Sequence, residues 1–285
     1  MKRIAAITMA RNDEFFLNRW VAYYGPLIGE ENLYIYLDGL DQKIPVGAGK
    51  SNVTIVPKEN INLYKYEPAR LSFLSDRAAE LFVRGYDLVI GVDADEFLAV
   101  DPNVGKNLAA YLSSIKINPS VSGLGLDFGQ HLKKEKPLDP KLPFLDQREY
   151  ALLSTRFTKP SVIARPESGR PAPRWGWGFH RVRGRNFHID PNLYLLHFGN
   201  ADYDALIKKA RDLDTVAAGR AWHFKRRRLS VVYDVTKKRA LNFDRAARFA
   251  RIIQTYFRPP WAWNKPFMLF MHWVIKIPKR FVGVV

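Results

Sequence analysis

The sequence predicts an α/β protein with a mostly parallel β-sheet flanked by helices and a basic, helical C-terminal extension. Two observations predict the sheet. Short, nearly continuous apolar segments alternate with segments whose apolar residues recur at helical spacing. Strands that are apolar on both faces are typical of parallel sheets covered by helices on both sides. The extension is predicted from a strongly uneven distribution of charge.

The first half of the chain has the pattern strand, helix, strand, strand, helix, strand. The segments are a strand at 3–10, a helix at 14–29, strands at 32–39 and 51–57, a helix at 70–85, and a strand that starts near Tyr86 and runs into the sequence DADEF.

The second half contains further elements of both kinds. They are a helix at 107–115, strands at 121–129 and 192–202, and helices at 203–218 and 241–257. Residues 130–174 are rich in Lys, Pro and Arg without clear periodicity, so we expect a surface loop there. The run KRRR at 225–228 is expected to be solvated.

Length and composition fit one α/β unit with an extension. Among the 285 residues there are no cysteines, which excludes disulfides and thiolate metal sites. The N-terminal apolar run is interrupted by Thr8 and stops at Arg11, so it predicts a buried strand rather than a signal peptide. No stretch reaches the roughly 18 apolar residues that a membrane-spanning helix needs. We divide the chain into an α/β domain at 1–202 and an extension at 203–285.

The charge distribution separates these two parts. The formal net charge is +17, and residues 201–285 alone contribute +13, with 19 of the 45 Lys and Arg but 6 of the 28 Asp and Glu. The basic character therefore belongs to the extension.

Acidic residues gather where predicted strands end. Asp38 ends the second strand, and Asp93, Asp95 and Glu96 follow the strand after Tyr86. Ligands of parallel sheets bind beyond the carboxyl ends of the strands. Two aspartates one residue apart can reach one hard cation, Mn²⁺ or Mg²⁺, which enzymes commonly hold between carboxylates and substrate phosphates. The spacing therefore predicts a nucleoside-diphosphate substrate, although a solvated loop or helix cap is the structural alternative.

Three stretches together resemble a known family. The sequence TMARNDEFFLNRWVAYYGPLIGEENLYIYLDGLDQ, then YDLVIGVDADEFL, then NLYLLHF, is similar to family 2 type glycosyltransferases of GT-A fold, in the bacterial branch whose acidic motif reads Asp-x-Asp-Glu-Phe. The resemblance covers roughly residues 3–200. It implies a Rossmann-like fold, a nucleotide-diphosphate sugar donor, and a glycan or lipid-linked acceptor in cell-surface polysaccharide or glycolipid synthesis.

The resemblance also implies roles for single residues. Asp93 and Asp95 match the motif that holds the metal and the diphosphate, and His197 matches a histidine that completes the metal shell. The implied nucleotide-binding residues are Arg11, Asn12, Asp38, Arg77 and Asp93. Each has a structural alternative: Asp38 can form a turn, Arg77 can be a surface helix residue, and His197 can be a core histidine.

A catalytic base is not evident from the sequence. An inverting transfer needs a carboxylate that accepts the proton of the acceptor hydroxyl. Asp127 and Glu167 are the candidates, and their alternatives are a strand cap and a loop residue.

Aromatic residues are concentrated in two basic segments. In RWGWGFHRV, Trp175, Trp177 and His180 are candidates for an acceptor site or lid, because aromatic faces stack on sugar rings; His180 also competes with His197 as a metal ligand, and a core-anchoring loop is the alternative. Residues 255–285 combine tryptophans with Lys and Arg. This pattern predicts peripheral attachment to an anionic membrane, on the cytoplasmic face, or a tail folded back on the domain.

Three other functions compete with the transferase. Nucleic-acid binding would use the basic aromatic extension, but no recognised module is present and no nucleic-acid partner is expected. A nucleotidyltransferase would carry a glycine-rich loop after the first strand, and TMARNDEFF has no glycine. A non-catalytic sugar-binding member of the fold is the third alternative.

Overall fold

The computed structural model describes residues 1–59, 63–184, 187–211, 224–257, 265–267 and 272–285. These residues form a ten-stranded mixed sheet with helices on both faces, and a separate two-stranded ribbon, β9 (Trp175–Gly176) with β10 (Arg181–Val182). The predicted α/β class is confirmed.

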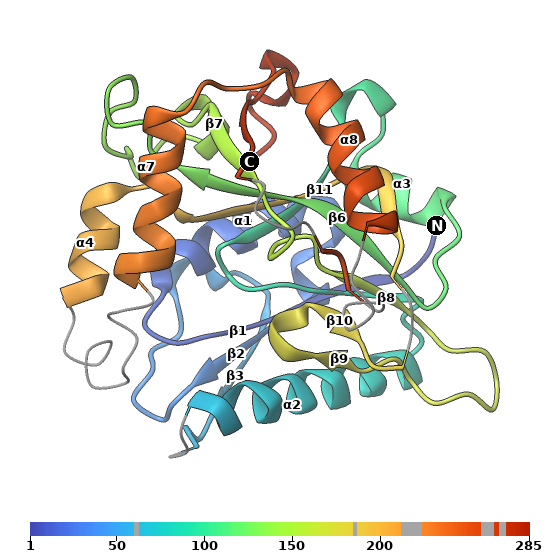
Figure 1. The fold of residues 1–285 in the computed structure, drawn as a ribbon. Coiled ribbons are helices and arrows are strands. Elements are labelled where there is room, and N and C mark those ends of the chain that lie inside the picture. Colours follow the sequence, from blue (N-terminus) through green and yellow to red (C-terminus); the bar gives the residue numbers. More distant parts are fainter. Residues whose placement is uncertain (60–62, 185–186, 212–223, 258–264, 268–271) are drawn as a thin grey trace.

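The N-terminal half builds the parallel part of the sheet. Its spatial order is β3 (Asn52–Val56), β2 (Leu33–Asp38), β1 (Ile4–Ala10) and β4 (Leu88–Gly91), all parallel. The crossover helices are α1 (Glu14–Ile28) and α2 (Leu63–Val83). Figure 1 shows α2 running along one side of β1, β2 and β3.

Burial on both faces explains why these strands are almost entirely apolar, with Thr8 of β1 and Asp38 at the end of β2 as buried polar residues. In β1, Ile4 and Ala6 belong to the core that includes α1, whereas Ala5 and Ile7 belong to the core that includes α2. The same alternation holds for β2, because side chains point to opposite faces at every second residue. No position of the strand can then be polar without losing contacts to one helix.

The second half extends the sheet with antiparallel pairs. β8 (Val162–Ala164) joins β4 to β6 (Ser120–Gly129), and β7 (Tyr150–Leu153) pairs with β6. β11 (Ile189–Asn200) lies parallel to β6 and antiparallel to β5 (Glu96–Val100), while α3 (Leu108–Ser114) contacts β5. The surface loop expected over 130–174 is wrong in part, because β7 and β8 are short, buried strands without the length to show a periodic pattern.

The C-terminal third packs on this sheet. It contains α4 (Tyr203–Arg211), a π-helical turn (Phe224–Arg228), α7 (Leu229–Lys237), α8 (Phe243–Tyr256) and β12 (Val274–Lys276). β12 pairs with β7, and α4, α7 and α8 lie across the sheet from α2 (Figure 1). None of the described helices combines the length and apolar composition that crossing a bilayer requires.

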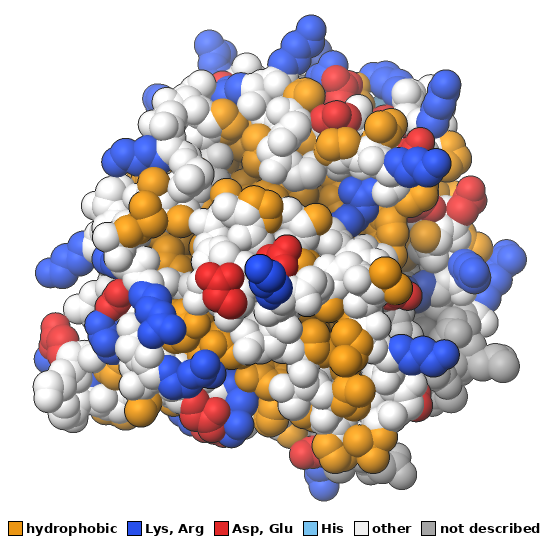
Figure 2. All heavy atoms as spheres, turned by 180° about the vertical axis from the view of Figure 1, so that it is seen from behind, with side chains coloured by type: hydrophobic (Ala, Val, Ile, Leu, Met, Phe, Trp, Pro, Cys, Tyr) orange, Lys and Arg blue, Asp and Glu red, His pale blue; other side chains and the backbone are white. Residues whose placement is uncertain are grey.

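The surface on the side away from the view of Figure 1 is mixed in character. Figure 2 shows Lys and Arg side chains spread over this face, with acidic side chains and apolar patches between them. On the described part of this face, the basic side chains are dispersed rather than gathered into one continuous patch.

Candidate functional site

Strand register places three polar side chains in one row across the sheet. His197 on β11 lies opposite Glu96 on β5 and opposite Asp127 on β6. Directly paired residues point to the same face of a sheet, so the three side chains share one face. All three are at most 5% exposed. The fold therefore brings the acidic motif and the late histidine together, as the resemblance implied.

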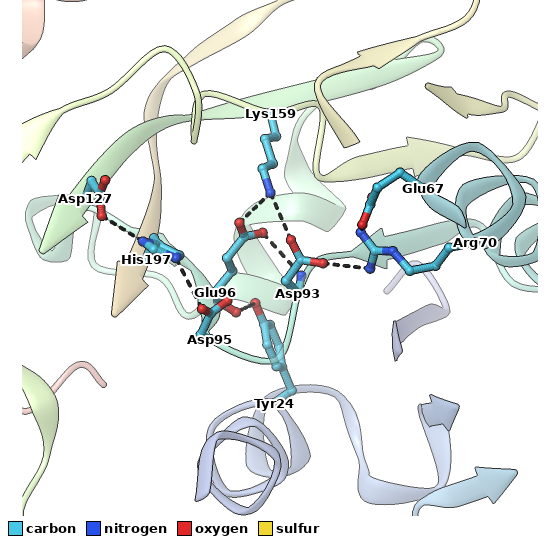
Figure 3. A network of polar contacts seen from close by, with 9 residues as sticks. All are labelled: Tyr24, Glu67, Arg70, Asp93, Asp95, Glu96, Asp127, Lys159 and His197. Atoms are coloured by element: carbon cyan, nitrogen blue, oxygen red, sulfur yellow. Dashed lines mark hydrogen bonds and ion pairs between the residues drawn. The ribbon is translucent and has the colours of Figure 1, made fainter. Parts of the chain in front are cut away.

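His197 lies between two carboxylates. Its Nδ1 is 2.7 Å from Asp127 Oδ1 and its Nε2 is 3.2 Å from Asp95 Oδ2 (Figure 3). Burial alone would lower the pKa of His197, but the charges of Asp95 and Asp127 outweigh it and raise this pKa to about 9. Burial would raise the pKa of Asp95, whereas His197 holds it well below its ordinary value. Phe157 covers the ring of His197, with centroids 3.7 Å apart.

Two buried cations balance the other acids of the motif. Lys159 Nζ lies 3.1 Å from Asp93 Oδ2 and 2.5 Å from Glu96 Oε1, and Arg70 Nη1 donates to Asp93 Oδ1 at 2.9 Å (Figure 3). Burial opposes charge on Asp93, but Lys159 and Arg70 prevail and lower its pKa to about 2. Glu96 is fully buried, and the effect of burial outweighs the charge of Lys159, so the pKa of Glu96 is raised. Side chains of the protein thus provide the compensation that buried carboxylates require.

A tight turn after β7 delivers Lys159. Thr158 Oγ1 accepts from the Gly125 amide at 3.0 Å and donates to the Ser154 carbonyl at 2.9 Å. A Cβ at Gly125 would come within 2.4 Å of backbone atoms of this turn. The turn can therefore lie directly on β6 only because Gly125 has no side chain. Lys159 was not predicted from the sequence, because nothing around it resembles a motif.

A cavity of about 310 Å³ opens beside these groups. Its lining carries more cationic than anionic side chains. The lining residues are Glu67, Arg70, Asp93, Asp127, Arg156, Phe157, Lys159, Gly178, His180, His197, Asn200, Arg227 and Arg228. Such a cavity suits an anionic ligand. Arg227 and Arg228 come from the run expected to be solvated; Arg227 is exposed as expected, whereas Arg228 is partly buried.

Asp95 and His197 fit a pair of metal ligands. A Cβ at Gly199 would lie 2.4 Å from Asp95 Oδ2, 2.7 Å from His197 Nε2 and 2.8 Å from Arg228 Nη1, so the absence of a side chain at Gly199 leaves space where the two ligand atoms converge, with a guanidinium group at its edge. The Asp127 carboxylate orients the imidazole as carboxylates behind metal-bound histidines do. The described residues contain no group of three His, Asp or Glu side chains arranged around one ion. Mg²⁺ and Mn²⁺ sites of this kind take remaining ligands from substrate phosphates and water.

The predicted nucleotide-binding residues of the first two strands form a separate network. Arg11 forms a bidentate ion pair with Asp41, with both distances 2.7 Å, and also donates to the Asp38 carbonyl. The Asn12 side chain accepts from Gln42. Asp38 is buried and its Oδ2 accepts from Tyr66 at 2.7 Å. These residues cluster at the carboxyl ends of β1 and β2, next to the start of α2, and do not line the cavity.

Arg77, the basic residue on α2 that was predicted to face the nucleotide, lies away from the cavity. Arg77 pairs with Glu80 at 2.6 Å and does not reach the cavity. Arg70 lies two turns earlier, about 10 Å along the axis, and contacts Asp93. The N-terminal part of α2 lies at the carboxyl ends of the strands, so a basic residue must come early in the helix to face the site.

The two candidate bases lie in different places. Asp127 lines the cavity, and its Oδ1 accepts from both His197 and Asn200 at 2.7 Å. Glu167 is exposed, pairs with Arg170 in a turn and does not line the cavity. The structure brings only Asp127 to the site.

Of the two candidates in the aromatic segment whose side chains the structure describes, His180 lines the cavity and Trp175 does not. Trp175 is fully buried against α2 and β4, and its Nε1 donates to the Pro160 carbonyl at 2.9 Å, so no face is free for a sugar ring. The side chain of Trp177 lies outside the described part of the structure. His180 lines the cavity, and burial together with Lys159 and Arg156 lowers its pKa to about 3. It is therefore neutral at physiological pH.

Comparisons with known proteins do not identify a function, so the functional argument depends on the geometry of the site. No family model matches the chain, and no curated protein matches it. Among solved structures, the chain is similar to mannose-1-phosphate geranyltransferase from Thermus thermophilus, with 11% identity over 83% of this chain and 71% of that one and a TM-score of 0.32. At this level the similarity distinguishes no activity.

Proposed function

We propose that the protein is a metal-dependent glycosyltransferase that moves a sugar from a nucleoside-diphosphate donor to a glycan or lipid-linked acceptor. The supporting observation is the chain of contacts from Asp127 through His197 to Asp95, which ends at the space left by Gly199 beside a cavity lined by cations. A carboxylate, an oriented imidazole and a cationic cavity together suit a divalent ion bound to a diphosphate.

The roles of the residues follow from their contacts. Asp95 and His197 would hold Mn²⁺ or Mg²⁺, which when bound neutralises the diphosphate as a leaving group. Asp127 positions His197. Asp93 pairs with Arg70 and Lys159, so in this proposal it holds these two cations at the cavity rather than completing a cluster of metal ligands. The nucleoside would extend toward Asp38 and Arg11, at the carboxyl ends of neighbouring strands.

We further propose that the reaction inverts the anomeric centre. Asp127 is the base candidate that lines the cavity, and the other acids of the lining, Glu67 and Asp93, both pair with Arg70. A single displacement needs no free carboxylate nucleophile, which is consistent with these pairings. The anomeric configuration of the product, measured by proton NMR, tests this part.

For location, we propose peripheral attachment to the cytoplasmic face of an anionic membrane through the basic C-terminal third. Part of the tail serves the fold instead, because Ile275 and Phe281 are buried in the sheet and core. Truncation before β12 would therefore disrupt the fold. Charge reversal at the exposed Arg245 and Arg248 of α8 should instead weaken sedimentation with anionic vesicles; unchanged sedimentation would contradict this route.

The transferase is tested by ligand-dependent stability. Sugar nucleotides should raise the melting temperature in the presence of Mn²⁺, because ligands that bind only the native state stabilise it. Asp95→Asn should remove the Mn²⁺-dependent part of this increase in melting temperature, and the transfer activity, while the protein remains folded. Asp204→Asn, at an exposed position of α4, is the matched control. A metal-dependent shift that persists in Asp95→Asn would overturn the proposal.

A further inference from the structure

The cations that line the cavity fall into two sets. Arg70 and Lys159 already bond to acids, namely Glu67, Asp93 and Glu96, as Figure 3 shows. A second set consists of Arg156, Arg227 and Arg228, and no acidic side chain of the described residues forms an ion pair with Arg156 or Arg227. The positive charges of Arg156 and Arg227 can therefore pair with an anionic ligand.

Two distant parts of the chain build this second set. Arg156 lies in the turn after β7, the same turn that delivers Lys159, and Arg227 and Arg228 lie in the π-helical turn before α7. Arg228 Nη1 donates to the Gly199 carbonyl at 3.3 Å, so it lies beside the Asp95 and His197 pair. The fold thus brings the basic run of the extension to the strand ends of the catalytic sheet.

The crowding of Arg156 with Arg227 and Arg228 is unfavourable. The nearby carboxylates of Asp127 and Asp95 offset only part of it, because burial and the two arginines still lower the pKa of Arg156. Arginine stays protonated, and like charges repel across a partly enclosed cavity. Burial, followed by the charges of Arg227 and Arg228, lowers the pKa of Arg156, which reflects this crowding. A guanidinium fork matches two phosphate oxygens. An arrangement that costs stability in the empty protein is expected where a ligand supplies the compensation.

We propose that Arg156, Arg227 and Arg228 form a phosphate-binding subsite that takes the diphosphate of the donor and retains the nucleoside diphosphate after transfer. This inference rests on the proposed transferase function and assigns to the basic extension a part in ligand binding. The two kinds of ligand then meet at Gly199, where a Cβ would lie 2.4 Å from Asp95 Oδ2, 2.7 Å from His197 Nε2 and 2.8 Å from Arg228 Nη1.

The test uses inorganic pyrophosphate with a chelator present, so that the divalent ion plays no part. The wild-type protein should bind pyrophosphate by calorimetry, and Arg156→Gln/Arg227→Gln should bind it about 10- to 100-fold more weakly, with a smaller salt dependence. Lys116→Gln, just after α3, removes one positive charge at an exposed position outside the extension and should bind pyrophosphate as the wild type does. Asp95→Asn should bind at least as tightly, because it removes a negative charge.

The ligand-free variants provide a second readout. Removing crowded charges should leave the melting temperature of Arg156→Gln/Arg227→Gln unchanged or raise it relative to Lys116→Gln. A clear fall in melting temperature would show that the arginines hold the fold together and would overturn the subsite. The subsite would also be overturned if the double variant bound pyrophosphate as tightly as the wild type, or if the wild type did not bind it.

The two proposals can fail separately. If the arginine substitutions left pyrophosphate binding unchanged while the wild type still bound sugar nucleotides in a Mn²⁺-dependent way, only the assignment of the arginines would be wrong. Arginine-dependent pyrophosphate binding without any sugar-nucleotide binding would leave an anion site in a protein that is not a transferase.

Discussion

The two aspartates of the acidic motif differ in the partners that hold them. Asp93 is bonded to Lys159 and Arg70, whose charges do not change near neutral pH, whereas Asp95 faces His197, whose charge does. The first arrangement is a fixed ionic network that stabilises the strand end. In the proposed metal site, the second would exchange a proton for a metal ion. On that proposal, the same two-residue spacing serves stability at one position and ligand exchange at the other.

The largest expected effect follows from removing the cation of the fixed network. Lys159→Met leaves Glu96 and Asp93 without their shared ammonium in a buried site, so the free energy of unfolding should fall by about 3–5 kcal/mol. Chemical denaturation monitored by circular dichroism measures this. Lys116→Met, at an exposed position, is the control. A loss no larger than that of the control would show that the network does not support the fold.

The second arrangement predicts a pH dependence of stability in the metal-free protein. The pKa of His197 is raised from 6.5 to about 9. The protonated His197 therefore stabilises the folded state fully below pH 6.5, and this stabilisation is lost as pH rises through 9. The contribution amounts to roughly 3 kcal/mol. His197→Gln should abolish this dependence between pH 6.5 and 10. If the variant keeps the wild-type slope, another group titrates.

The same protonation state predicts proton release on metal binding. At pH 7.5 His197 carries a proton that must leave before Nε2 can bind Mn²⁺, so each bound ion should release close to one proton. Calorimetry in buffers with different ionisation enthalpies measures the number. Gly199→Ala should eliminate the metal uptake itself, because its Cβ would occupy the space between Asp95 and His197. Metal uptake by this variant at wild-type affinity would place the ion elsewhere.

The smallest effect concerns α2. Arg77→Gln, on the part of the helix away from the cavity, should change stability by no more than about 0.5 kcal/mol and leave donor binding unchanged. Arg70→Gln removes the contact to Asp93 and should lower both the stability of the protein and its affinity for the donor. Measuring donor binding of the two variants side by side tests whether the early turns of α2 face the nucleotide. Equal effects would contradict that orientation.

Local sequence patterns were sufficient to predict the parallel part of the fold. Strands β1, β2 and β4 are buried on both faces, so their apolar runs identify them without a structure, and the helical period of α2 is equally clear. The acids at strand ends followed from the same reasoning. Strands β7, β8 and β12 are three or four residues long and were not predicted, because such segments are too short to show a period.

The sequence by itself determined where the carboxylates lie, because strand ends are local features of the chain. Only the tertiary structure decided which groups meet them. Lys159, Arg228 and the space at Gly199 reach the motif through strand register and through a turn packed on Gly125. Such contacts join residues far apart in the chain, and neither spacing nor composition records them.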